Sequence, residues 1–181
     1  MNDLALKQEC QQIVLPEQVR RAIVDGSPKI VVPFNKRYPT EDHSLVEVRP
    51  DNYAVFQTHK PLVHRFQYLL PLSPDTSYRL NEEWQVFRVG KDKKDVFVLK
   101  YGMHYAPRIR WMPATIMPED LTRTRMRTGQ VDALRLFELL GIEASGDAHA
   151  SVQTEWDETY PDRPLRTNPW VAVAEIKRGG R

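Results

Sequence analysis

Fourteen prolines, against only eight glycines, divide this 181-residue chain into short segments. Proline fixes its own φ angle and has no backbone N–H to donate, so it ends strands and helices and stiffens the turns between them. The segments between the prolines carry short runs of β-branched and aromatic residues, which are typical of strands. The sequence therefore predicts many short strands joined by stiff turns, with few helices.

The clearest local pattern is a hairpin, in which runs at 84–89 and 96–101 flank the polar loop 91–95. Apolar residues at helical spacing predict helices at 16–24 and 131–140, and a helical turn is expected at 151–159. Further strands are expected at 29–34, 45–49, 53–56 and 170–176. This mixture predicts an α+β fold class, with one domain over 1–181 built round a small β-barrel or curled mixed sheet and flanked by two to three helices.

Composition narrows the classes of protein. Hydrophobic residues make up 41% and charged residues 28%, which excludes a disordered or collagen-like chain, and no stretch approaches the 18 apolar residues of a membrane span. The first residues do not resemble a secretion signal, so a cytoplasmic location is expected. The single cysteine, Cys10, and the absence of Cys/His clusters predict neither a disulfide nor a bound metal, and no cofactor is indicated.

A run of arginines is the most informative polar feature. Arg123, Arg125 and Arg127 alternate with Thr124 and Met126, so a strand here would place all three guanidinium groups on one face. The net charge of the chain is only +2, so attraction to a polyanion has to come from such local clusters. The alternative interpretation is a solvated strand face that nearby carboxylates neutralise.

Aromatic and basic residues just upstream support the same reading. Arg108 and Arg110 lie just before Trp111. Guanidinium groups bind phosphates through paired hydrogen bonds and aromatic rings stack on bases, so this combination is typical of nucleic-acid binding. Tryptophans are more often core anchors, which is the expectation for Trp84, Trp156 and Trp170, whereas Trp111 is expected at the surface.

Catalytic motifs are scarce. The chain has no glycine-rich phosphate loop, nucleophile elbow or His-Glu-x-x-His motif, and its five histidines are scattered. Lys29 follows a tight turn and opens an apolar strand, where an amine is either partly desolvated or extends to water.

A series of short motifs in the second half of the chain resembles a phage and prophage branch of the ASCH domain family, which belongs to the PUA-like superfamily. The motifs are Trp111-Met112-Pro113, Met117-Pro118 followed by Arg123, Leu140-Gly141-Ile142, Trp156, and Asn168-Pro169-Trp170-Val171. In the first half, the stretch 19–26 resembles the family's first helix, which ends at Asp-Gly. The stretch 35–78 matches poorly and is interpreted as a divergent insertion.

The resemblance implies a PUA-like barrel and an association with RNA. Family members that hydrolyse acetylated cytidine use a lysine, a threonine and a glutamate in the cleft. Of these three residues only the lysine is retained here, as Lys29, and it is displaced by one position. The position of the family's glutamate falls at or near Arg88 in this sequence, although Glu82 and Glu83 lie close by. Replacing a carboxylate by a guanidinium removes the base, so the sequence favours binding over catalysis.

Three functions follow as hypotheses. The first is binding of RNA or a nucleotide in one basic cleft. The second is an amidohydrolase acting on a modified nucleoside such as acetylated cytidine, with Lys29 as the activated amine. The third is a non-enzymatic phage accessory protein that binds a host protein through 35–78. The residues expected to form the cleft of the first hypothesis are Lys29, Arg88, Arg108, Arg110, Trp111, Arg123 and Arg125.

Overall fold

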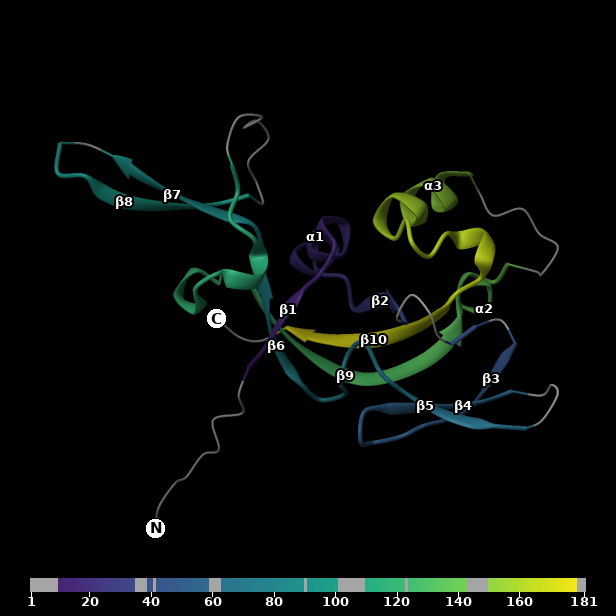
Figure 1. The fold of residues 1–181 in the computed structure, drawn as a ribbon. Helices are drawn as coiled ribbons and strands as arrows, with labels where there is room; N and C mark the ends of the chain where they lie inside the picture. Colours follow the sequence, from purple (N-terminus) through teal and green to yellow (C-terminus); the bar gives the residue numbers. More distant parts are fainter. Residues whose placement is uncertain are drawn as a thin grey trace, which may run out of the picture.

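The computed structural model describes residues 10–34, 39–40, 42–58, 63–89, 91–100, 110–122, 124–142 and 150–178. Within these ranges the chain forms three sheets and three α-helices, which confirms the expected α+β class (Figure 1). The sheets have the strand orders β1-β6-β9-β10-β2, β3-β4-β5 and β7-β8, and none of them closes into a barrel. The strands are β1 (Gln11–Val14), β2 (Lys29–Pro33), β3 (His43–Val48), β4 (Tyr53–Thr58), β5 (Arg65–Leu69), β6 (Ser77–Asn81), β7 (Trp84–Val89), β8 (Lys94–Leu99), β9 (Thr124–Arg135) and β10 (Trp170–Arg178). The helices are α1 (Glu17–Asp25), α2 (Leu136–Leu140) and α3 (Ala150–Thr159), with 3-10 turns η1 (Ala114–Ile116), η2 (Glu119–Leu121) and η3 (Leu165–Thr167).

The five-stranded sheet is the scaffold, and β10 lies near its middle, paired antiparallel with both β9 and β2. Val171 to Ala174 are all buried, because this part of the strand is covered on both faces. Ala172 and Ala174 belong to the main hydrophobic core, whereas Val171 and Val173 belong to a smaller second core. β9 and β10 are visibly curved in Figure 1, and the register between them shifts between Ala174 and Ile176.

The main core lies between this sheet and the sheet β3-β4-β5, which faces it in Figure 1. Phe56 on β4 is fully buried and meets Trp170 at a ring-centroid distance of 4.9 Å and Phe34 at 5.7 Å. Leu72 is also fully buried. The stretch 35–78, interpreted above as an insertion, therefore supplies three strands and central core side chains.

The second core is covered by α2, α3 and η3. Leu165 is buried there beside the half-buried Trp156, whose indole Nε1–H donates to the carbonyl of Arg163 at 2.6 Å. Asn168 connects η3 to β10 with φ of 42°, and its Oδ1 accepts the backbone N–H of Phe137 at 2.8 Å. The motif Asn168-Pro169-Trp170 thus fixes where β10 begins relative to α2.

Two of the sequence expectations for regular structure have clear outcomes. The hairpin is confirmed, since β7 and β8 pair antiparallel from Trp84 with Leu99 to Val89 with Lys94. The helix expected at 131–140 is wrong over its first half. Residues through Arg135 continue β9, because they pair with β10 as far as Trp170, and only α2 is helical. Gly141, with φ of 66°, ends α2 in the left-handed conformation.

His43 is a packing residue, as expected from the scattered histidines. Its Nδ1 accepts the backbone N–H of Thr40 at 3.3 Å, and its ring meets the rings of Phe56, Phe66 and Tyr68. Burial lowers the pKa of His43, and Arg135 adds to this while Asp42 opposes it. The neutral imidazole is thus the form that fits its surroundings.

The helices and the potential metal-ligating side chains of the described part of the chain bear on membranes and metals. None of the helices there has the length and apolar character needed to cross a membrane. No group of three or more His, Cys, Asp or Glu side chains in the same residues is placed to hold a metal ion.

Candidate functional site

The arginines of β9 alternate with core residues. Arg125 and Arg127 are exposed, whereas Met126 and Thr128 between and after them are buried. This is the period-two arrangement expected for a strand with one solvent face. Met126 packs into the main core and Thr128 donates to the carbonyl of Ser73 at 2.6 Å, so the buried face fixes the direction of the exposed one. Arg123, the third member of the run, lies outside the described residues.

Neighbouring strands extend this exposed row into a patch. Arg79 on β6 pairs in register with Arg125, and Lys177 on β10 pairs with Arg127. We call Arg79, Arg125, Arg127 and Lys177 the basic strip. Side chains directly opposite each other on adjacent strands point to the same face and lie about 5 Å apart at Cβ, so these four cations gather across three strands.

Carboxylates compensate only part of this charge. Glu119 on η2 meets Arg79 at 3.1 Å and Arg125 at 3.5 Å, and Asp75 lies 4.0 Å from Lys177. Glu175 lies beside Lys177 over Gly129, where an added Cβ would come within 3.2 Å of the Glu175 Oε2. Within the described residues Arg127 forms no ion pair. Arg125 and Glu119 are both exposed, and solvent-exposed ion pairs contribute about 0–1 kcal/mol, so an incoming phosphate can replace Glu119 at Arg125 at small cost.

The other residues expected in the cleft lie elsewhere. Lys29 begins β2 and pairs with Glu175 on the far side of β10 from β9. Arg88 lies on β7, which extends away from the body of the molecule in Figure 1, and its Nε is 3.5 Å from Asp95. Arg108 is outside the described residues. The structure therefore does not bring Lys29, Arg88 and Arg125 into one cleft.

Arg110 and Trp111 lie at the base of the β7-β8 hairpin. The carbonyl of Arg110 accepts a hydrogen bond from Gln85 Nε2, and Met112, two residues further along, exchanges two backbone hydrogen bonds with Trp84. Arg110 is exposed and Trp111 is half-buried, whereas Trp84 is only 8% exposed. The core role expected for Trp84 is thus confirmed.

Lys29 instead lines an apolar cavity of about 270 Å³ between α1, β2, α2 and α3. Its walls are mostly aliphatic, and polar side chains from α3, including Glu155 and Thr159, share the lining with Lys29. Tyr160 closes one side, where its hydroxyl donates to the carbonyl of Val31 at 2.9 Å. Burial raises the pKa of Tyr160 well above its usual range, so this phenol stays neutral and structural.

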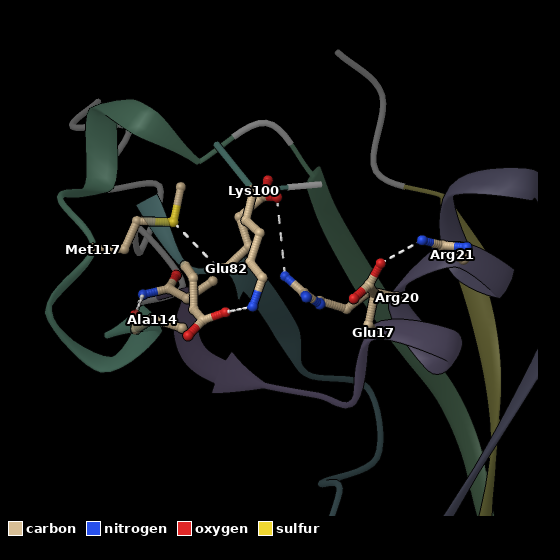
Figure 2. A network of polar contacts seen from close by, with 9 residues as sticks. Glu17, Arg20, Arg21, Glu82, Lys100, Ala114 and Met117 are labelled. Atoms are coloured by element: carbon tan, nitrogen blue, oxygen red, sulfur yellow. Dashed lines mark hydrogen bonds and ion pairs between the residues drawn. The ribbon is translucent and has the colours of Figure 1, made fainter. Parts of the chain in front are cut away.

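A buried charged pair joins α1 to the end of β6. Arg20 Nη1 lies 4.0 Å from Glu82 Oε2, with side chains only 13% and 9% exposed (Figure 2). The backbone N–H of Glu82 donates to Met117 Sδ at 3.3 Å, and Asn81 Nδ2 donates to the carbonyl of Ala114 at 2.9 Å. Removing one partner of a buried pair leaves the other charge buried and unpaired, so this contact holds α1 against the sheet.

The sequence interpretation did not single out Glu82 as a buried residue, although a signal was present. Tyr78 and Leu80 are buried on one face of β6, and Glu82 continues their period of two. The strand alternation therefore directs the Glu82 carboxylate toward the core just after β6 ends.

Comparisons with known proteins give no relative. No protein-family model, no curated protein and no solved structure matches this chain. The likeness to ASCH domains thus rests on the motifs quoted above.

Proposed function

We propose that this protein binds RNA, or a nucleotide, through the basic strip, and that its curved sheet is a divergent, open form of the PUA-like barrel of the phage ASCH type. The observation that carries the proposal is the register of β6, β9 and β10, which places four cations on one open face. Guanidinium groups are suited to phosphate because their planar donors match its oxygens. RNA is the polyanion with which the resembled family is associated.

The form of the strip favours contact with a phosphate backbone. Arg125, Arg127 and Lys177 are exposed and Arg79 is partly buried, and the four lie on an open sheet face and not in an enclosed pocket. Phosphate contacts position a nucleic acid without reading its bases, so binding by the strip alone is expected to depend weakly on sequence.

The test is the salt dependence of RNA affinity. We expect a fluorescently labelled single-stranded RNA of about 12 nucleotides to bind, with log affinity falling by about 0.7 per log unit of salt for each phosphate neutralised. Four such contacts predict a loss of about fifty-fold between about 50 and 200 mM salt, measured by fluorescence anisotropy. Affinity that does not change with salt, or no binding at the lower salt concentration, contradicts the proposal.

A second candidate function is favoured by the cavity beside Lys29. It brings a lysine, a threonine and a glutamate to one lining, the side-chain types that the resembled amidohydrolases use, although Glu155 and Thr159 here come from α3. A lysine amine, a carboxylate and a hydroxyl in one cavity are side chains that can support nucleophilic or acid–base chemistry.

Amidohydrolase activity predicts that the protein releases acetate from acetylated cytidine and that Lys29→Ala abolishes the release. Lys177→Ala is the matched control, since Lys177 lies on the strip and outside the cavity lining. Acetate is measured in a coupled assay. No turnover by the wild-type protein at high concentration excludes this candidate and leaves the binding proposal untouched.

A further inference from the structure

The β7-β8 hairpin is an arm that presents side chains to solvent on both faces. Within the described residues its strands pair only with each other, apart from the bridge between Trp84 and Met112. In Figure 1 the arm extends away from the central sheet. Four of its apolar side chains are between 38% and 55% exposed: Val86, Val89, Val96 and Phe97.

The base of the arm is held firmly. Trp84 is buried and exchanges two backbone hydrogen bonds with Met112, and Lys100 forms an ion pair with Glu83. A two-stranded hairpin is marginally stable on its own, so this anchoring keeps the arm formed while its outer part remains uncovered.

The arm carries an excess of positive charge. Between Trp84 and Lys100 there are five basic residues and two acidic ones, a net charge of +3, whereas the whole chain has a net charge of +2. Lys91, Lys93 and Lys94 form the tip. The rest of the chain therefore has a net charge of −1, and the arm is a local concentration of positive charge that attracts a polyanion.

An exposed aromatic ring lies among these charges. Phe97 is 47% exposed and pairs in register with Val86, and its ring lies 6.2 Å from that of Trp84 at an interplanar angle of 39°. The next pair on the same face is Arg88 with Asp95. One face of the arm thus presents a ring that can stack on a base next to a guanidinium that can meet its phosphate.

We infer that the arm is the base-contacting part of an RNA site, in which Phe97 stacks on an unpaired base while Arg88 and the tip lysines hold the adjoining phosphates. This inference rests on the proposed function and specifies its ligand as single-stranded RNA. Aromatic rings accept unpaired bases of any sequence, and cations beside them track the backbone. β6 runs into β7 through Glu82 and Glu83, so the strip and the arm are consecutive along the chain.

A protein partner suits the arm less well. Lysine is depleted from the cores of protein interfaces because its charge is costly to desolvate. Three lysines at the tip and Arg88 midway along the arm would have to be covered together with the valines.

The test uses two labelled probes of about 12 nucleotides, a single-stranded RNA and a ribose-phosphate chain of the same length without bases. Phe97→Ala is expected to weaken binding of the RNA about tenfold and to leave binding of the abasic chain unchanged, because a base stack is lost and the phosphate contacts remain. Phe97→Tyr, which keeps the ring, is expected to retain wild-type affinity. Phe66→Ala is the matched control, since Phe66 is 40% exposed on β5.

The outcomes separate the two proposals. If the wild-type protein binds both probes and Phe97→Ala binds the RNA as tightly as the wild type does, the arm inference is overturned and the basic strip stands. If the wild-type protein binds neither probe, the proposed function fails as well. If the protein elutes as a dimer that Phe97→Ala converts to a monomer with unchanged RNA affinity, the arm is a self-association surface and the inference is wrong.

Discussion

Reversing Arg125 and Arg127 together to glutamate is expected to weaken RNA binding by more than a hundredfold. A hydrogen bond to a charged group contributes about 1.5–3 kcal/mol, and losing two such contacts costs at least about 3 kcal/mol, where each 1.4 kcal/mol is a tenfold change in affinity. The two new carboxylates also repel phosphate. Binding is measured by fluorescence anisotropy at low salt, where surface charges are screened least.

Folding should survive this double reversal. Both side chains are exposed, Arg127 has no ion pair within the described residues, and Glu119 keeps Arg79 as its partner when Arg125 is replaced. The far-ultraviolet circular dichroism spectrum and the melting temperature are therefore expected to stay close to wild type.

The control has the same change in net charge at a different place. Arg65 on β5 and Arg166 on η3 are exposed arginines outside the strip, and Arg65→Glu with Arg166→Glu is expected to weaken binding only a few-fold through the long-range field. If this control loses as much affinity as the strip variant, the contact is not local and the strip is not the binding site.

The features that the sequence predicted well are local ones. The β7-β8 hairpin follows from two apolar runs and the polar loop between them, and the loop itself contains Lys93 with φ of 49°. The outward direction of Arg125 and Arg127 follows from strand alternation, which needs only the buried Met126 between them. Neither prediction requires knowledge of a distant partner.

The features that could not be predicted from the sequence depend on contacts between distant segments. Leu134, Phe137 and Leu140 have helical spacing, yet pairing of β9 with Trp170 to Ala174 of β10 draws the first part of the stretch 131–140 into the sheet. The single basic cleft fails for the same reason. The local sequence pattern predicted that Lys29 and Arg88 lie on strands. It could not predict that β2 pairs on the far side of β10 from β9, or that the arm extends away from the sheet, because these positions depend on long-range contacts.

Replacing Phe56 by alanine is expected to lower the free energy of unfolding by about 3–5 kcal/mol, the range for large aromatic side chains lost from a core. Phe56 is fully buried and packs against Trp170 at 4.9 Å, Phe34 at 5.7 Å and Tyr68 at 5.6 Å between ring centroids, so a cavity would open where the two sheets meet. Urea unfolding measures the change as a lower midpoint.

Phe66→Ala is the matched control for this change. Phe66 pairs with Phe56 in register on the adjacent strand β5, yet it is 40% exposed, and its replacement is expected to cost only about 1 kcal/mol. The comparison decides the status of the stretch 35–78. If it is a dispensable insertion, Phe56→Ala unfolds at nearly the wild-type urea concentration, like the control. If its strands complete the core beneath the sheet that bears the basic strip, Phe56→Ala is the more destabilised variant by at least about 2 kcal/mol.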